Sequence, residues 1–382
     1  MRALGWLALA TTVACSGGNN DGRKGKKSDK EPGTTEVIGM LDVERYDTTT
    51  NRNGVFEVEV DVSDDTTAFQ ITGISPDLYV AVEELYDPDG NRVLFWEDLW
   101  DAPRSLTDAI FGYGGTTAFN WPIRDEDGPL TPGVWRARMS MVDDRYNYAD
   151  SAPVEVTVAT KADDDFDSAV VSVQIVWADG IDSDPDSVAA VEAAVARWKE
   201  VWGAQGLTLD ETYVSSTLDP RLEFVAESFG DDEVEQVARD KAPGALQLVV
   251  GEQIFNSGST YGIAAGIPGT IEASGMSWTV ISLVVHAGPD GVFDEPETNL
   301  MGETMAHEVG HYAGLYHPVE DGFENWDSLD DTVECTRARE CEDELGTNLM
   351  FPYSICDANG CVVTEDLTPA QGGVMNRYLG AL

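Results

Sequence analysis

The stretch "HEVGHYAGLYHP" (307–318) decides the expected fold, because it holds three of the chain's four histidines. On a helix, His307 and His311 lie four residues apart and project from one face, close enough for two imidazole nitrogens to bind one ion. Glu308 lies beside that ion in sequence but is not placed to bind it. Two interpretations are open at this point: a metal site, or a helix that happens to be rich in histidine.

The surrounding residues favour the metal site. An apolar stripe precedes the histidines and recurs every four residues, at Met301, Met305 and Val309. We expect this stripe to face the core, with Asn299 as the N-cap, so that the histidines point away from the packing. Gly314 follows the helix, and a glycine ends a helix in a left-handed conformation at little cost. The turn there would bring His317 back to complete a site of three nitrogens.

The spacing of these residues matches the signature H-E-x-x-H-x-x-G-x-x-H. The chain therefore resembles the metzincin zinc metallopeptidases. Within them it is most similar to the pappalysin-like family, because further segments occur in that family's order: "LDDTVEC" (329–335), "TNLM" (347–350), the nearby cysteines and "LTPAQGGVMNRYL" (367–379). The resemblance covers roughly residues 168–382 and implies an α+β catalytic domain of the zincin/metzincin class.

The resemblance also implies a role for each site residue. One catalytic Zn²⁺ would be held by His307, His311 and His317, with Glu308 as the general base. Met350 would form the methionine turn beneath the metal. Tyr353 is a candidate hydrogen-bond donor to the developing oxyanion, although it follows the methionine by three residues where some metzincins have a tyrosine after two. His286, at the end of "ISLVVH", is expected at a strand end and not as a ligand.

The expected reaction is hydrolysis of peptide bonds in a protein or peptide substrate. A bound Zn²⁺ lowers the pKa of water to about 7 and polarises the scissile carbonyl. Glu308 would accept the proton from that water and pass it to the departing amine. Two alternatives are a structural or metal-scavenging zinc protein and a lipoprotein binding module whose β-sandwich is the working part and whose zinc domain is vestigial. The intact Glu308 argues against the second alternative.

With 382 residues the chain is long enough for about two domains. Residues 35–162 alternate apolar and polar side chains, first in "VFEVEVDV" (55–62) and then in runs near 78–85, 92–96, 134–142 and 154–160, which predicts an all-β sandwich accessory domain. The acidic stretch "KADDDFD" (161–167) marks the expected boundary. The catalytic domain (166–382) is predicted to contain strands at 169–178, 245–250 and 279–285. A helix is predicted within 184–206, with Asp184 as its N-cap and Gly203 as its C-cap.

The N-terminal residues have the pattern of an export signal. "MRALGWLALATTVAC" (1–15) combines one arginine, a short apolar run and small residues before Cys15, which resembles a bacterial lipoprotein processing site. We therefore expect an exported protein, either an outer-membrane or cell-surface lipoprotein attached through Cys15 or a secreted protein. Residues 16–34 are polar and glycine-rich and predict a disordered linker. Any membrane contact would come from that lipid anchor alone.

The other cysteines fit an oxidising compartment. Cys335, Cys341, Cys356 and Cys361 lie close together near the C-terminus and predict two disulfides. The sequence leaves all three pairings open.

The formal net charge of −47 argues against nucleic acid as a partner and makes Ca²⁺ binding by clustered carboxylates worth considering. Such a surface repels phosphate backbones, so we expect no binding to nucleic acid. Two acidic clusters, within 289–297 and 327–331, lie in loop-like sequence that we expect beside the histidines, and they are either solvated surface or Ca²⁺ ligands. The candidate ligands are Asp290, Asp294, Asp327, Asp330 and Asp331. Substrate specificity, physiological target, activation mechanism and oligomeric state have no signal in the sequence.

Overall fold

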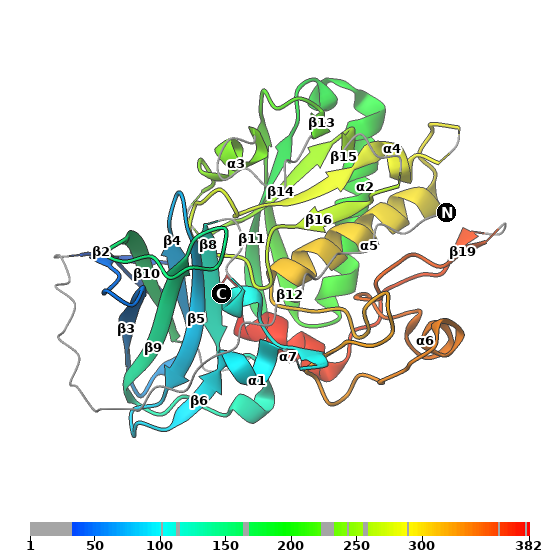
Figure 1. Cartoon of the computed structure of the whole chain (residues 1–382). Helices are drawn as coiled ribbons and strands as arrows, with labels where there is room; N and C mark the ends of the chain where they lie inside the picture. The colour runs from blue at the N-terminus through cyan, green and yellow to red at the C-terminus, as the bar shows by residue number, and fades with distance from the viewer. Residues whose placement is uncertain are drawn as a thin grey trace.

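The protein is a mixed α+β structure with several sheets, seen here in a computed structural model. The structure describes residues 33–100, 102–111, 115–162, 168–222, 233–242, 244–254, 259–288, 290–357, 360–378 and 380–382. Two antiparallel sheets from the first part of the chain lie beside a second unit that is built on a five-stranded, mostly parallel sheet (Figure 1).

The two N-terminal sheets are antiparallel throughout. The first has the order β1 (Thr34–Ile38), β2 (Leu41–Thr49), β10 (Pro153–Ala162), β4 (Thr66–Ile74), β8 (Thr116–Trp121). The second has the order β3 (Val55–Val62), β9 (Gly133–Val142), β5 (Tyr79–Tyr86), β6 (Arg92–Phe95). The predicted runs at 55–62, 78–85, 92–96, 134–142 and 154–160 correspond to β3, β5, β6, β9 and β10.

Strand β3 shows why this part of the chain forms sheets. Its valines are buried while Glu57, Glu59 and Asp61 are exposed, so the alternation in the sequence places one face in the core and one in water. Buried side chains from both sheets belong to one continuous core, including Val58, Phe69, Ile71, Val82 and Met139. The chain between β6 and β8 forms short elements: α1 (Trp96–Trp100), β7 (Arg104–Ser105) and η1 (Asp108–Ile110). Another short turn, η2 (Asp125–Asp127), precedes β9.

The sheet of the second unit has the order β12 (Leu207–Ser215), β11 (Ala169–Trp177), β14 (Leu246–Gly251), β17 (Thr279–Ser282), β16 (Gly262–Ala264). Its strands run parallel except β16, which is antiparallel to β17. The run 279–285 is shorter as a strand than predicted, because the backbone turns after Ser282 into α4 (Leu283–His286).

The two long helices of this unit pack directly against each other. Helix α2 (Pro185–Gly203) begins at the predicted cap, where the Asp184 side chain accepts a hydrogen bond from the Ser187 amide, and it buries Trp198 and Trp202. Helix α5 (Glu295–Tyr312) crosses α2 so closely that a Cβ on Gly302 would lie 2.4 Å from the Ala194 carbonyl oxygen.

The predicted N-cap of α5 was wrong. The helix begins at Glu295, one turn before Asn299, and Asp294 is the N-cap. The Asp294 carboxylate accepts from the Glu297 amide while the Glu297 carboxylate accepts from the Asp294 amide. This reciprocal capping box satisfies two amides at the helix start, which a cap at Asn299 would have left unpaired.

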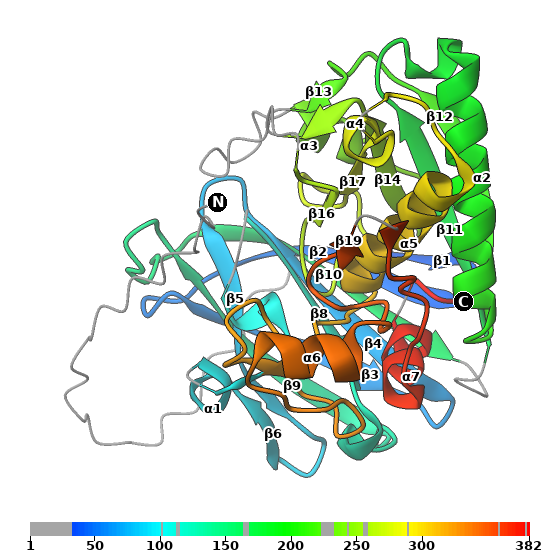
Figure 2. The same cartoon turned by 90° about the vertical axis from the view of Figure 1, so that its right-hand side faces the viewer.

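The remaining elements lie around these layers. They are η3 (Ile181–Ser183), β13 (Arg221–Leu222), α3 (Glu233–Ala238), β15 (Gln253–Ile254), β18 (Trp326–Asp327), α6 (Ala338–Leu345), β19 (Cys356–Asp357), β20 (Gly360–Cys361) and α7 (Pro369–Arg377). Figure 2 shows α6 and α7 on the side of α5 away from β13.

The four C-terminal cysteines form two disulfides, as predicted. Each cysteine pairs with its neighbour in sequence, Cys335 with Cys341 and Cys356 with Cys361. The first disulfide is buried in a small separate core with Val319, Leu345 and Phe351.

The export signal, Cys15 and most of the linker lie outside the described residues. None of the described helices is both long enough and apolar enough to span a membrane.

Candidate metal centre

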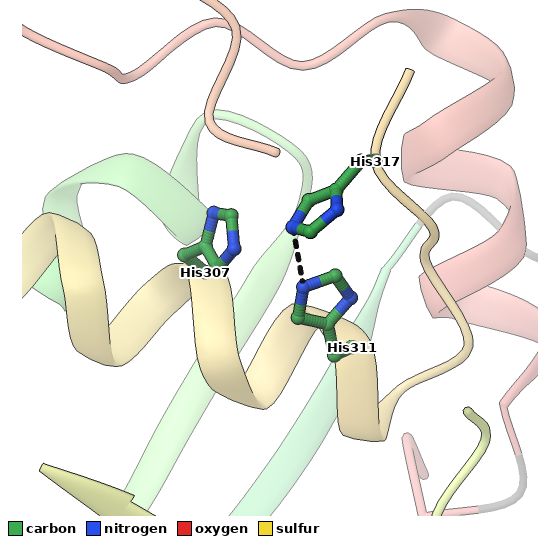
Figure 3. A group of neighbouring side chains, drawn as sticks. All are labelled: His307, His311 and His317. Carbon is green, nitrogen blue, oxygen red and sulfur yellow. Dashed lines mark hydrogen bonds between the residues drawn. The ribbon is translucent and has the colours of Figure 1, made fainter. Parts of the chain in front are cut away.

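Helix α5 and the turn after it bring the three histidines together. His307 and His311 project from one face of the last turns of α5, and His317 approaches them from the segment beyond the helix (Figure 3). The helix ends at Tyr312, and Gly314 has a φ of +106°, a conformation that favours glycine. This turn reverses the chain, as predicted, so that His317 faces His311.

Hydrogen bonds fix the orientation of each ring. The Nδ1 atom of His307 lies 2.7 Å from the Leu349 carbonyl oxygen, and that of His311 lies 2.7 Å from the Leu315 carbonyl oxygen. The Nδ1 atom of His317 lies 2.9 Å from Oε2 of Glu320. A carbonyl or a carboxylate only accepts, so each Nδ1 carries a proton, and in the neutral form of each ring Nε2 presents a lone pair.

Three lone pairs therefore converge on one point. The ligand atoms of the three histidines lie within 4.8 Å of one another, and the Nε2 atoms of His311 and His317 are 3.1 Å apart. Two acceptors at that distance repel each other unless a cation lies between them. Three imidazole nitrogens with outer carboxyl or carbonyl partners are the donor set that Zn²⁺ takes at an open catalytic site. The residues present thus fit a zinc ion.

The electrostatic environment keeps the rings of His307 and His311 neutral, as metal ligation requires. Burial, together with the neighbouring His317, lowers the pKa of His307 to about 3. The same causes and the nearby His307 hold the pKa of His311 well below its usual value.

Glu308 is buried beside this point, between the helix and the edge strand β16. Burial raises the pKa of its carboxyl to about 8. The site has room for Glu308 only because residue 262 is a glycine, since a Cβ there would lie 2.5 Å from Cγ of Glu308 and 2.9 Å from its Oε1.

Met350 lies beneath α5. It is fully buried, and a Cβ on Gly310 would come within 2.9 Å of its sulfur atom. The turn that carries it is tied by a hydrogen bond from the Met350 amide to the Asn348 side chain. The preceding residue, Leu349, supplies the carbonyl that orients His307. The turn therefore contacts both the helix and the first histidine.

Tyr353 and His286 are both engaged elsewhere. The Tyr353 hydroxyl donates to Oε1 of Glu342 on α6 at 3.2 Å, and its ring packs on Phe351. A role as oxyanion donor stays a prediction and requires this hydroxyl to leave Glu342. His286 lies at the end of α4 and not at a strand end as predicted, because the backbone turns into a helix after Ser282. It is buried, with Nδ1 near the Ser282 carbonyl at 2.6 Å and Nε2 near the Thr304 hydroxyl at 3.0 Å.

The structure separates the two acidic clusters. Asp290 and Asp294 lie at the N-terminal end of α5, roughly 20 Å along the helix from His307, so this cluster is not beside the histidines as the sequence suggested. Asp290 accepts from the Val292 amide, and Asp294 is the helix cap. A cavity of about 1090 Å³ lies at this end of the helix, and none of the three histidines lines it.

The second cluster follows the third histidine. Asp330 pairs with Arg104, and Asp331 accepts from the Thr368 hydroxyl and the Ala370 amide. Asp327 is 3% exposed, and its Oδ1 accepts from the Leu329 amide and the Thr332 hydroxyl. Its Oδ2 is buried without a hydrogen-bond partner, and burial raises the pKa of this carboxyl to about 6. Within the described ranges, the three histidines are the one group of three or more His, Cys, Asp or Glu side chains close enough to share an ion.

Sequence reasoning missed three contributors to the site. Glu320 orients His317 from three residues away, a spacing that could have drawn attention to it. The Leu349 carbonyl and Gly262 had no local signal, because both reach the site from segments distant in sequence.

No family model matches the chain, and no curated protein matches it. Among solved structures it is similar to archaemetzincin from Methanopyrus kandleri, with 18% identity and a TM-score of 0.27, over 46% of this chain and 93% of that one. It is also similar to metalloproteinase-II from Bacteroides fragilis, with 11% identity and a TM-score of 0.27, over 50% of this chain and 61% of that one. Such low scores leave the site's own geometry to decide the function.

Proposed function

We propose that the chain is a zinc-dependent endopeptidase of the metzincin type, similar to the pappalysin-like family. The observation that carries the proposal is the convergence of three Nε2 lone pairs, each fixed by an acceptor at Nδ1. The H-E-x-x-H-x-x-G-x-x-H spacing, the turn at Gly314 and the placement of Met350 under Gly310 support the finer assignment.

His307, His311 and His317 would hold the ion. Bound in such a site, Zn²⁺ acidifies a water molecule and polarises the carbonyl under attack. Three protein ligands leave a position open for that chemistry, whereas a structural zinc site is closed by four.

Glu308 would move the proton. Its carboxylate accepts a proton from the attacking water and delivers it to the nitrogen of the leaving amine. Without a cation, burial raises the pKa of this carboxyl to about 8 and favours its protonated form, which cannot accept a proton. A cation in the site would lower that pKa, since it favours the ionised carboxylate.

A peptide substrate is supported by the strand next to Glu308. Among the described strands, β16 is the edge of the five-stranded sheet, and Gly262 of β16 contacts Glu308. Extended peptides bind exposed sheet edges through their main-chain hydrogen bonds. A peptide paired with β16 would pass beside the proposed base.

For the whole chain we propose an export signal at 1–15 with lipidation at Cys15, a linker at 16–34, a β-sandwich accessory domain at 35–162 and the catalytic domain at 166–382. The two disulfides are compatible with an exported protein. Ca²⁺ binding is proposed for the cluster that contains Asp327, because that carboxylate has a buried oxygen without a partner.

The test compares the wild-type protein with Glu308→Ala. We expect about one zinc per chain in both, measured by elemental analysis, and a loss of peptide hydrolysis of about 10²- to 10⁴-fold in the variant. Cleavage sites in a peptide library would define the specificity. The matched control is Glu295→Ala, which removes an exposed glutamate from the far end of the same helix and should keep full activity.

Three outcomes would contradict the proposal. A Glu308→Ala variant that cleaves as fast as wild type would remove Glu308 as the base. A wild-type protein that binds zinc but hydrolyses no peptide would favour a structural or metal-scavenging role. A wild-type protein without zinc would remove the metal site altogether.

A further inference from the structure

The segment between β6 and β8 lies in the N-terminal part of the chain but contacts the second unit. We call that unit the metal unit because it carries the three histidines. Strand β7 pairs in parallel with β18, with Arg104 opposite Trp326 and Ser105 opposite Asp327. The Trp326 amide donates to the Pro103 carbonyl at 2.8 Å. Arg104 adds ion pairs with Asp330 at 2.9 Å and with Glu334. Residues more than 200 positions apart in sequence thus form one small sheet.

This small sheet reaches the loop that carries the third histidine. Trp326 of β18 forms an antiparallel bridge with Val319, two residues after His317. The next residue, Glu320, donates its amide to the Asn325 carbonyl and holds His317 Nδ1 with its carboxylate. The segment with β7 therefore contacts, through β18, the loop after α5 that carries His317 (the His317 loop).

Asp108 contacts the same loop from its other end. The Tyr316 hydroxyl donates to Oδ1 of Asp108 at 2.7 Å, and Tyr316 immediately precedes His317. The Asp108 amide donates to the Ile267 carbonyl at 2.8 Å, so the aspartate is itself fixed on the metal unit.

Buried polar contacts hold the two units in this position. The Gln70 side chain donates to the Gly269 carbonyl at 3.2 Å and accepts from the Ile271 amide at 3.0 Å. The hydroxyls of Thr72 and Thr270 are 2.8 Å apart. Arg45 binds Glu272 through two nitrogens, at 3.0 and 2.8 Å. These contacts involve residues 269–272, a few positions after the Ile267 that binds the Asp108 amide, so Asp108 lies on a surface that is docked on the metal unit.

We infer that Asp108 is a positioning residue for the third metal ligand, acting through the Tyr316 hydroxyl, so that the N-terminal sheets complete the metal site. The inference rests on the proposed function, because it assumes that His307, His311 and His317 bind zinc.

The physical reason is that His317 has no helix to hold it. The first two ligands are fixed by α5, whereas the third lies in a loop after Gly314 and depends on contacts from outside. Partners beyond the first ligands typically change metal affinity by about 10- to 100-fold when they are removed. Asp108 acts one contact further out, so we expect an effect near the lower end of that range.

The experiment measures zinc affinity of the full chain by titration in a metal buffer, with melting curves to confirm folding. Asp108→Ala and Tyr316→Phe should each weaken zinc binding about tenfold. The double variant should be no weaker than either single variant, because both changes break one hydrogen bond. Asp108→Asn keeps an acceptor for the hydroxyl and should stay within about twofold of wild type.

The matched control is Asp125→Ala. Asp125 also lies on the N-terminal unit and pairs across the same interface, but its partner is Arg377 of α7 and not a residue of the His317 loop. Its loss should leave zinc affinity unchanged. The inference is overturned if Tyr316→Phe and Asp108→Ala bind zinc as tightly as wild type, if their effects add, or if Asp125→Ala weakens zinc equally. A wild-type chain that binds no zinc would instead defeat the proposed function and the inference with it.

Discussion

At the scale of single residues, the proposed metal site depends on the group that accepts a hydrogen bond from Nδ1 of each histidine. Two of the three histidines are oriented by backbone carbonyls, which no side-chain substitution removes. His317 alone among the three is oriented by a side chain, the carboxylate of Glu320. A carboxylate behind an imidazole fixes its tautomer and makes the metal-binding nitrogen more basic. Glu320 is therefore the residue at which a single substitution would change the proposed metal site without replacing a histidine.

Replacing Glu320 tests this dependence. Glu320→Ala should weaken zinc binding by about 10- to 100-fold, because the His317 ring loses its acceptor. Glu320→Gln keeps an acceptor but no charge, so its zinc affinity should lie between those of Glu320→Ala and wild type. Zinc competition with a chromogenic chelator measures both. Glu324→Ala removes an exposed glutamate from the same loop as a control. Equal affinity for zinc in Glu320→Ala and Glu324→Ala would show that the carboxylate has no role.

Asp327 is the residue on which the calcium proposal depends. Burial raises its pKa to about 6, above its usual value of 3.8. Between about pH 4 and pH 6 the folded state keeps a proton that the unfolded chain releases, so the free energy of unfolding falls as the pH rises through this window. Above pH 6 the buried Asp327 carboxyl is ionised, which lowers the free energy of unfolding by on the order of 2 to 3 kcal/mol. A bound cation would offset it.

We therefore expect Asp327→Asn to melt at a higher temperature than wild type at pH 7.5 without calcium, with the difference closing near pH 4. Adding Ca²⁺ at constant free zinc should raise the melting temperature of wild type and of Asp290→Asn but not of Asp327→Asn. Melting curves in a metal buffer give all three values. No response of wild type to Ca²⁺ would leave both acidic clusters as surface charge only.

At the scale of elements, the turn after α5 decides whether three histidines or two can meet. The helix fixes the direction of His307 and His311, but only the reversal at Gly314 returns the chain towards them. A side chain at this position meets two obstacles. Its φ of +106° is unfavourable for an L-residue, and a Cβ would lie 3.2 Å from Val374 Cγ1.

Gly314→Ala should therefore destabilise the fold by about 1 to 3 kcal/mol and lower zinc affinity, since relief of the strain moves His317. Melting temperature and zinc content measure the two effects. The control is Gly203→Ala at the end of α2, where a Cβ meets nothing within 4 Å and alanine favours the helix. If Gly314→Ala matched Gly203→Ala in both measurements, the turn would not depend on glycine.

At the scale of the whole molecule, two features matter: the net charge, and the contacts between the N-terminal sheets and the metal unit. The chain has 70 acidic and 23 basic residues, and a large net charge of one sign destabilises a compact state by self-repulsion. The N-terminal sheets lie against the metal unit through buried polar contacts, at Gln70 and Thr72 above all.

Screening of this charge should stabilise the protein. Raising the ionic strength from about 10 mM to about 150 mM shortens the Debye length from about 30 Å to about 8 Å, and the melting temperature should rise. Choline chloride at the same ionic strength should act like sodium chloride, because screening does not depend on the kind of cation. A melting temperature that is flat or falls with salt would show that self-repulsion is not a significant cost.

The sequence by itself determined the local features. Alternation in 55–62 predicted β3 and its buried face, the 184–206 pattern predicted α2 and its Asp184 cap, and the histidine spacing predicted the cluster of three histidines and the turn at Gly314. These features depend on residues a few positions apart, whose side-chain directions follow from helix or strand periodicity. The start of α5 was predicted wrongly because two equally local caps competed, and the capping box at Asp294 was the stronger one.

Only the tertiary structure decided the contacts between distant segments. It paired the cysteines in sequence order, gave Glu308 its space at Gly262, placed the Leu349 carbonyl behind His307 and moved Asp290 and Asp294 away from the histidines. It also placed Asp108 against Tyr316 across more than 200 residues of chain. Periodicity says which face of an element is apolar, but it does not say which other element covers that face, because that depends on how all the layers pack together.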